Sequence, residues 1–210
     1  MCMGGSYRVR FLGLIMVCPI VFLVACKNLG GAQDGMHINK VREEIQTQPE
    51  EEPKGSLIEI STFSTQLLDE EENRIKNLSL AADILNDEKI PSGAEFSFNE
   101  TLGRRTKEKG YKEAPIIKNT EKGPQKALGV GGGICQLSST LYNAAEGAGL
   151  EITERHQHSK NVGYVQEGKD ATVVYGSQDF KFKNNQTYSI IIKAEVSSKE
   201  VSIKLLKVED

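Results

Sequence analysis

LGVGGGICQLSSTLYN, residues 128–143, joins a glycine-rich loop to the start of a helix. Glycine permits positive φ angles and the close approach of a neighbouring chain, so the loop is expected to pack tightly. The helix is predicted over about 135–148, because apolar residues recur there at helical spacing: Leu137, Leu141, Ala144 and Ala148. Gly149 suits the position just past the helix end.

Cys135 is the residue in this stretch that indicates chemistry. The first turn of a helix carries unpaired N–H groups and the positive end of the helix dipole. A thiolate is stabilised in that position, and the thiolate is the reactive form of cysteine. We therefore expect Cys135 to be a reactive thiol. The alternative is a small buried residue that lets the helix and a strand pack closely.

The residues around the cysteine are expected to bind a substrate. The N–H groups from Gly133 to Gln136 are candidates for an oxyanion hole. Alternatively, the glycines bind a carboxylate or phosphate, although no Gly-Lys-Ser/Thr of a phosphate-binding loop follows them. The predicted substrate-binding residues are Gly131, Gly132, Gly133, Gln136, Ser138 and Tyr142.

The segments on either side predict a single α+β domain over residues 57–210 with two main helices. The first helix is predicted over 72–85, where four apolar residues share one face: Ile75, Leu78, Ala82 and Leu85. Alternating or β-rich segments predict strands at 58–63, 96–98, 150–156, 171–175, 179–182, 188–196 and 201–208. Helices followed by a run of strands are typical of an α+β fold with a largely antiparallel sheet.

The N-terminus has the features of a bacterial lipoprotein signal peptide. Arg8 and Arg10 precede an apolar stretch over residues 11–24, which is shorter than the roughly 20 residues of a membrane span and is typical of a signal peptide. Leu23-Val24-Ala25-Cys26 resembles the lipobox, so we expect removal of residues 1–25 and lipidation of Cys26. The alternative is an uncleaved anchor. Both place the rest of the chain outside the cytoplasmic membrane.

Residues 26–56 are predicted to form the lipidated N-terminus and a flexible acidic linker, because they are polar and acidic and contain little to bury. Cys2 and Cys18 lie in the signal peptide, so Cys135 is expected to be the one free thiol and no disulfide is expected. The formal net charge of -3 argues against a nucleic-acid partner, because phosphate binding requires a basic surface. Membrane association is expected to depend on the lipid.

Several further motifs resemble the VanW family. They are Phe96–Glu100, Gly110–Pro115, Gly129–Asn143, Glu154–Ser159, Tyr164, Gly168–Val173 and Phe180–Asn185. The resemblance covers roughly residues 60–196, nearly the whole globular part. Gln157 departs from the proline expected between the two histidines in many relatives, which alters loop stiffness without removing a functional group. The resemblance implies a place in the cell envelope of Gram-positive bacteria.

Cys135, His156 and Asp170 occur in the order found in papain-like and transglutaminase-like cysteine enzymes. In those enzymes a histidine takes the thiol proton, and a third group holds the imidazole in the required tautomer. We expect Cys135 to be the nucleophile, His156 the base and Asp170 the orienting residue. His158 is the alternative base.

Carboxylates offer an alternative catalytic group. Cleavage of a glycan strand needs a carboxylic acid with a raised pKa. Glu100 is the main candidate and Glu113 a further one, with Glu154 as an assisting residue. For any single glutamate the simpler interpretation is a solvated surface carboxylate.

A zinc site is another alternative. His156 and His158 would need a third ligand such as Cys135 or Asp170. No short Cys-x-x-Cys or His-x-x-x-His spacing supports such a site. We therefore expect no metal and no cofactor.

The first functional hypothesis is a lipoprotein, anchored at the cell membrane on its extracytoplasmic face, that binds or modifies peptidoglycan or its precursors. As an enzyme it would perform cysteine-dependent amide or acyl chemistry on stem peptides. The alternatives are cleavage of the glycan strand by Glu100, and a non-catalytic wall-binding module in which the glycine loop, Tyr142 and the histidines form a recognition groove. The sequence leaves open whether the protein is an enzyme.

Overall fold

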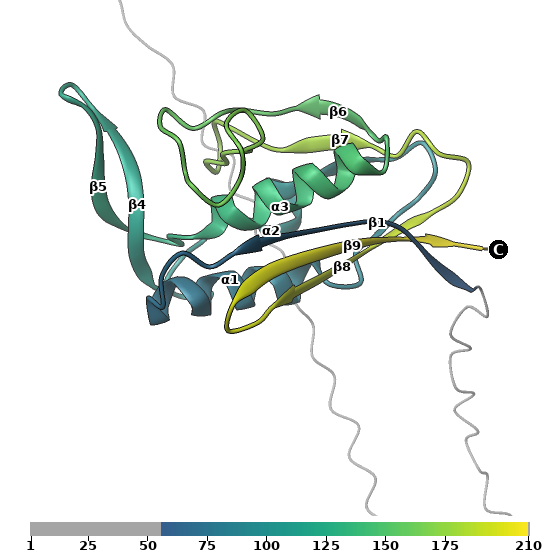
Figure 1. Cartoon of the computed structure of the whole chain (residues 1–210), viewed down its shortest axis with the longest axis horizontal. Helices are drawn as coiled ribbons and strands as arrows, with labels where there is room; N and C mark the ends of the chain where they lie inside the picture. The colour runs from purple at the N-terminus through teal and green to yellow at the C-terminus, as the bar shows by residue number, and fades with distance from the viewer. Residues whose placement is uncertain (1–55, 210) are drawn as a thin grey trace, which may run out of the picture. The chain divides into compact units, whose positions relative to one another are not determined.

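Helix α3 (Ile134–Gly147) lies between two antiparallel sheets in the computed structural model of the chain (Figure 1). The structure describes residues 56–209. The predicted signal peptide, the lipidation of Cys26 and the linker up to residue 55 lie outside the described residues. Within residues 56–209, no helix is long and apolar enough to cross a membrane.

The larger sheet has four strands in the order β1-β9-β8-β2. They are β1 (Leu57–Gln66), β2 (Lys89–Ile90), β8 (Ile190–Val196) and β9 (Glu200–Val208). The first strand of the domain pairs antiparallel with the last, and β8 and β9 form a hairpin. Val201, Ile203 and Leu205 alternate along β9 and are fully buried, which is the period-two pattern of a strand with one covered face.

Two helices cover the apolar face of this sheet. α1 (Glu72–Leu85) packs mainly on β8, whereas α3 packs on β1 and β9. A smaller sheet lies on the other side of α3 (Figure 1) and consists of β3 (Glu95–Ser97), β7 (Lys181–Lys183) and β6 (Glu151–Glu154), in the order β3-β7-β6. Tyr142 of α3 meets the Phe180 ring edge-on, with the centroids 5.8 Å apart. α3 is therefore enclosed by both sheets.

The predicted fold class is confirmed: the described residues form helices and antiparallel sheets of an α+β domain. The first helix coincides with its predicted span, and α3 begins one residue before its predicted start. The strand predictions at 58–63 and 201–208 are confirmed as parts of β1 and β9, and the strand predicted at 188–196 is confirmed from Ile190 onward as β8.

The prediction of a strand at 171–175 is wrong. This segment forms isolated bridges, between His156 and Thr172 and between Val174 and Gln178. Its backbone at Ala171 hydrogen-bonds side chains of α3 instead of a neighbouring strand. The segment is therefore a connection whose position α3 fixes.

The short strand predicted at 96–98 ends at Ser97, and Phe98 begins helix α2 (Phe98–Leu102). Ser97 Oγ accepts the N–H of Glu100 at 3.1 Å. A serine in this position is a helix N-cap, and this explains why the strand stops there.

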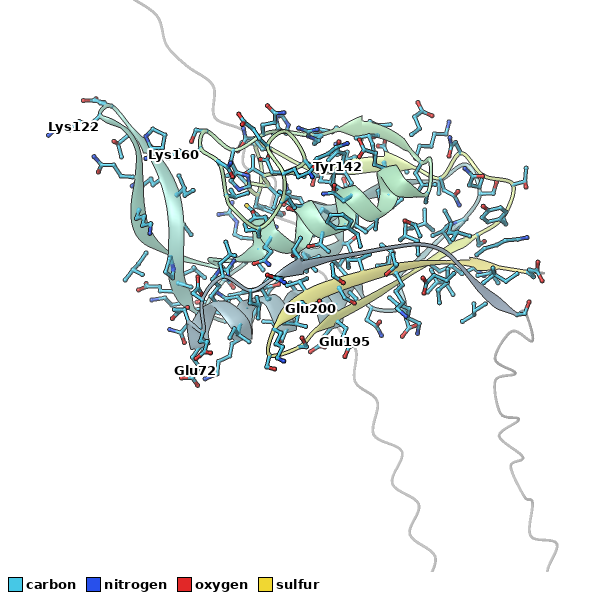
Figure 2. The ribbon with its side chains drawn as sticks, viewed as in Figure 1. Glu72, Lys122, Tyr142, Lys160, Glu195 and Glu200 are labelled. Atoms are coloured by element: carbon cyan, nitrogen blue, oxygen red, sulfur yellow. The ribbon has the colours of Figure 1, made fainter. Side chains whose placement is uncertain are left out.

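β4 (Glu113–Thr120) and β5 (Gly123–Val130) form a hairpin that the sequence patterns did not predict. Its strands pair along their whole length, and it projects away from both sheets with Lys122 at its tip (Figure 2). Pro115 and Pro124 hide its strand character, yet a two-stranded hairpin tolerates proline because each strand has a free edge. The hairpin leads directly into the glycine run before α3.

α1 holds the glycine run in place through Asn77. This side chain is fully buried, and its Nδ2 donates to the carbonyls of Lys112 and Gly132 at 3.0 Å each. Three residues of the predicted apolar stripe are buried beside it: Leu78, Ala82 and Leu85. Ile75 is only partly buried, because the buried face turns toward Asn77 and the loop.

Gly133 is confined at the start of α3. Its φ is 104°, and a Cβ there would lie 2.7 Å from Cγ of Arg74. Gly149, just beyond α3, also has a positive φ of 67°, but a Cβ there would meet nothing within 4 Å. A side chain at Gly149 would therefore meet backbone strain alone, whereas a side chain at Gly133 would meet both backbone strain and steric overlap with Arg74.

We expect Gly133→Ala to lower the free energy of unfolding more than Gly149→Ala does. Both substitutions strain the backbone by roughly 1–3 kcal/mol, and overpacking against Arg74 adds about 1–3 kcal/mol at Gly133. Denaturant unfolding of each variant, followed by circular dichroism, measures the difference. Equal losses would show that Arg74 does not confine Gly133.

Candidate functional site

Cys135 is the one residue between Ile134 and Ala145 of α3 that is not buried. Its Sγ lies 3.5 Å from Oγ1 of Thr172, and the N–H of Val173 donates to it at 3.5 Å. The thiol therefore lies between the first turn of α3 and the segment 170–173.

Two buried serines fasten this segment to α3. Ser138 Oγ donates to the Ala171 carbonyl at 2.6 Å, and Ser139 Oγ accepts the Ala171 N–H at 2.9 Å. Ser139 Oγ also donates to the Cys135 carbonyl at 2.7 Å. The helix turn that carries the cysteine and the segment opposite it thus share hydrogen bonds, which fixes the residues that face the thiol.

Antiparallel pairing brings His158 and Asp170 together. The N–H of Thr172 donates to the His156 carbonyl at 2.8 Å in an antiparallel bridge, and two residues further along such a pair His158 stands opposite Asp170. Oδ2 of Asp170 lies 2.6 Å from Nδ1 of His158 and also accepts the His158 N–H at 2.6 Å. Nδ1 is therefore engaged, and Nε2 is the nitrogen left to exchange a proton with the thiol.

The charges of Cys135 and His158 stabilise each other. Burial opposes ionisation of the thiol, but a hydrogen bond and the positive charge of His158, together with Val173 and Thr172, lower the pKa of Cys135 overall. Burial also opposes protonation of the imidazole, yet the hydrogen bonds and charges of Cys135 and Asp170 raise the pKa of His158. Both pKa shifts therefore favour transfer of a proton from the thiol to the imidazole.

His156, the expected base, is not part of this group. Its Nε2 lies 2.9 Å from Oε1 of Glu154, and Lys181 Nζ lies 3.0 Å from the other Glu154 oxygen. The register is the reason, because it places Thr172 opposite His156 and Asp170 opposite His158. His158, the alternative base, therefore replaces His156 as the candidate base.

Two N–H groups at the junction of loop and helix are without an acceptor among residues 56–209. They belong to Gly133 and Cys135. Their neighbours donate to backbone carbonyls: Gly131, Gly132, Ile134 and Gln136. An N–H on the nucleophilic residue itself is a common donor in oxyanion holes, so these two groups are candidates for that role.

Gln136 and Ser138, both expected to bind substrate, belong to the scaffold. Gln136 is 1% exposed, and its amide accepts from Arg74 and donates to Oγ1 of Thr65 at 2.9 Å. Ser138 is fully buried and donates to Ala171. A buried side chain whose hydrogen bonds are all made within the protein offers nothing to a ligand, so these two assignments are corrected.

The glycines Gly131, Gly132 and Gly133 allow close packing around the cysteine. A Cβ at Gly132 would lie 2.6 Å from the Ala114 carbonyl oxygen of the hairpin, and one at Gly131 would lie 3.0 Å from Cβ of Arg105. Side chains at these positions would push the loop away from its neighbours. The glycine run therefore presents backbone groups rather than side chains at the start of α3, among them the N–H of Gly133.

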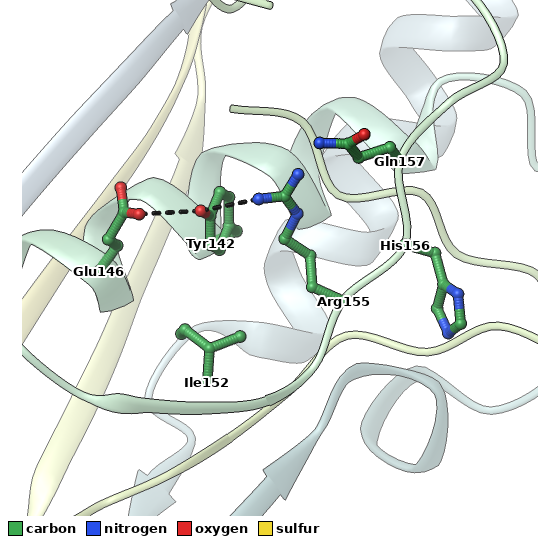
Figure 3. A pocket seen from close by; sticks show the side chains of 6 residues that line it. All are labelled: Tyr142, Glu146, Ile152, Arg155, His156 and Gln157. Atoms are coloured by element: carbon green, nitrogen blue, oxygen red, sulfur yellow. Dashed lines mark hydrogen bonds between the residues drawn. The ribbon is translucent and has the colours of Figure 1, made fainter. Parts of the chain in front are cut away.

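Tyr142 lines an open pocket two helical turns from Cys135 (Figure 3). Its hydroxyl donates to Oε1 of Glu146 at 2.9 Å and accepts from Nη1 of Arg155 at 2.9 Å. The Arg155 guanidinium also lies 4.7 Å from the centre of the Tyr142 ring. Ile152, His156 and Gln157 complete the lining. This pocket is therefore polar and neighbours the site on the side of His156.

Tyr164 is a residue near the thiol whose role the sequence did not indicate. Burial and the negative charge of Cys135 raise the pKa of its phenol. It comes from the loop after His158, and that loop encloses a second, smaller pocket bordered by His158 and Asp170. In the sequence, the resemblance to the VanW family included Tyr164 and Thr172 but assigned no function to either residue.

The alternative catalytic carboxylates lie apart from this group. Glu100 is exposed on α2, and Glu113 forms an exposed ion pair with Lys107 at 2.8 Å. Hydrogen bonds from His156 and Lys181 lower the pKa of Glu154 to about 2, so this carboxylate stays ionised and is unsuited to act as an acid near neutral pH. Within the described residues, no cluster of three His, Cys, Asp or Glu side chains is arranged to hold a metal ion.

We expect Cys135 to react with iodoacetamide below the ordinary thiol pKa of about 8.5, because His158 stabilises the thiolate. His158→Gln removes this partner, so the pH profile of alkylation should move to higher pH, whereas His156→Gln should leave it in place. Mass spectrometry of the tryptic peptide that carries Cys135 gives the rates. Identical profiles for the two variants would exclude His158 as the partner of the thiol.

Comparison with known proteins identifies relatives of this chain. Residues 73–206 match the family model described as VanW like protein. The chain is 42% identical over 140 residues to the uncharacterized protein YoaR of Bacillus subtilis (strain 168), which covers 67% of this chain and 45% of YoaR. No solved structure matches this chain.

A second relative is the vancomycin B-type resistance protein VanW of Enterococcus faecalis (strain ATCC 700802 / V583). It is 32% identical over 128 residues, which is 57% of this chain and 45% of the relative. The chain thus spans slightly less than half the length of each of these relatives. Since the family model covers most of the domain described above, the chain belongs to the VanW family.

Proposed function

We propose that the protein is a lipid-anchored envelope protein whose Cys135 thiol performs acyl transfer on the stem peptides of peptidoglycan. The observation that carries this proposal is the arrangement of Cys135, His158 and Asp170 at the start of α3. Membership of the VanW family, with a relative named for vancomycin resistance, supports a role related to the cell wall.

In the proposed reaction the Cys135 thiolate attacks the carbonyl carbon of a peptide amide. The C–N bond breaks, the protonated His158 gives its proton to the leaving amine, and a thioester remains on Cys135. Water or a second amine then attacks the thioester and passes a proton to His158, which restores the thiolate and the imidazolium. Asp170 holds the imidazole ring throughout, since it bonds both the ring and the backbone of His158.

The tetrahedral intermediates of this reaction carry a negative oxygen. The N–H groups of Gly133 and Cys135 lie at the N-cap and in the first turn of α3, where the helix dipole also favours negative charge. They are the donors that we assign to this oxygen. Their use would explain why the loop before the cysteine is built from glycine, which brings the backbone itself to the reacting carbonyl.

The proposed location follows from Leu23-Val24-Ala25-Cys26. A lipid on Cys26 and the polar segment after it would hold the domain outside the membrane, where peptidoglycan is assembled. Stem peptides supply amide bonds, and the site requires no metal for the chemistry described.

We expect the full chain, purified in mild detergent, to release or join stem peptides when it is incubated with purified peptidoglycan. Cys135→Ala and His158→Gln should lose at least 100-fold in rate, in line with the roughly 10²–10⁴-fold contribution of a general base, whereas Glu100→Gln should retain activity. Mass spectrometry of the soluble products identifies the bond that changes.

Two outcomes contradict this proposal. Products that persist in Cys135→Ala but vanish in Glu100→Gln would indicate cleavage of the glycan strand by a carboxylate. Sedimentation of the protein with the wall, without new products, would indicate a binding module and leave Cys135 a structural role.

We expect Cys26→Ala to abolish lipid attachment in cells. The unmodified thiol is the acceptor of the lipid, so incorporation of a labelled fatty acid should fall to background, while Cys18→Ala keeps it. Labelled fatty acid retained in Cys26→Ala would contradict the anchor at this residue.

A further inference from the structure

Arg105 is a positively charged residue near the thiol, and it has no role in the proposed reaction. It follows α2, and its stem packs against Gly131 in the loop before α3. Nη1 donates to Oδ1 of Asn99 at 2.7 Å and to the Gly103 carbonyl at 3.0 Å. The guanidinium carbon lies 5.9 Å from the centre of the Tyr175 ring, and Tyr175 is two residues beyond Val173, whose N–H donates to the Cys135 sulfur. The guanidinium also interacts electrostatically with Cys135.

The guanidinium has donors left for a ligand. Its hydrogen bonds in the described part of the chain all come from Nη1 and go to neutral acceptors, although a guanidinium carries five N–H groups. Asp179 is the nearby acid, but its oxygens accept from Ser97 Oγ at 2.6 Å and from the N–H of Asn99 at 2.9 Å. Among residues 56–209, Arg105 forms no ion pair, so its charge is compensated only at longer range.

A buried hydroxyl supports the same conclusion. Tyr111 is 1% exposed, and its hydroxyl makes no hydrogen bond among the described residues. It interacts electrostatically with Arg105. The Tyr111 N–H donates to the carbonyl of Thr106, the residue after Arg105, at 3.2 Å. An unpaired buried hydroxyl costs free energy, which a polar ligand that reached it would reduce.

A second cation borders the same position. The guanidinium carbons of Arg104 and Arg105 lie 5.0 and 5.9 Å from the centre of the Tyr175 ring. Arg104 is exposed, and Tyr175 is 44% exposed. The ring thus holds two arginines at a surface that a substrate can approach.

We propose that Arg105, with Arg104 and Tyr175 at the rim, binds a carboxylate of the peptide substrate near Cys135. The planar fork of a guanidinium matches the two oxygens of a carboxylate, and peptide chain ends supply such a group. This subsite would direct the thiol to an amide bond close to a carboxylate-bearing residue. The proposal rests on the proposed function for its substrate, yet its test needs no turnover.

Alkylation of Cys135 by iodoacetate and by iodoacetamide provides the test, because only the first reagent carries a carboxylate. In the full chain, purified in mild detergent, the iodoacetate-to-iodoacetamide rate ratio should fall about tenfold in Arg105→Gln, as expected for the loss of one charge-assisted hydrogen bond. Arg104→Gln, at the rim, should change it about threefold or less, as for an exposed charge, and the control Lys122→Gln, at the exposed tip of the β4–β5 hairpin, should leave it unchanged. An unchanged ratio in Arg105→Gln would overturn the proposal.

Protection of the wild-type protein tests the subsite without relying on the folding of a variant. N-acetylalanine should slow the iodoacetamide reaction of Cys135, and N-acetylalanine amide at the same concentration should not. Equal protection by both, or stronger protection by inorganic phosphate, would overturn a carboxylate subsite. If protection is found but peptidoglycan is unchanged, the subsite stands and the proposed function fails.

Discussion

The hydrogen bonds between Ser138, Ser139 and the backbone of Ala171 are the constraint on which the candidate site depends. They hold the segment 170–173 against the turn of α3 that carries Cys135. Because both serines are buried, water does not compete for these bonds. The pairing register of this segment then decides which histidine faces the thiol. Ser138 and Ser139, one helical turn beyond Cys135, thus fix the segment that holds His158 in position.

The enclosure of α3 has a second consequence. A helix that is buried on nearly all sides leaves few positions for a ligand, and Cys135 is the one that is partly exposed between Ile134 and Ala145. Burial alone would raise the pKa of its thiol. The polar neighbours reverse this effect, and among them His158 contributes most. A thiol that is lowered in pKa despite burial is typical of a functional site rather than of core packing.

The charged groups around the thiol differ in whether their charge is compensated by a close partner. His158 and Asp170 form one close pair at 2.6 Å, which compensates its own charge. Arg105 adds a positive charge without a close acidic partner among residues 56–209, and Tyr142 and Arg155 line a polar pocket near His156. The thiol is therefore surrounded by polar and positively charged groups, which supports the proposal of a polar, anionic peptide substrate.

The sequence by itself determined both main helices, the antiparallel character of the sheets and the position of Cys135 at a helix start, because periodicity, glycine and chain order are local properties. It did not determine the β4–β5 hairpin, whose prolines hide its alternation. Nor could it choose between His156 and His158, which are two residues apart and chemically identical. Only the tertiary structure decided this, because the pairing register opposes His158 to Asp170. The burial of Gln136 and the nearness of Arg105 to the thiol likewise depend on contacts between residues far apart in the chain.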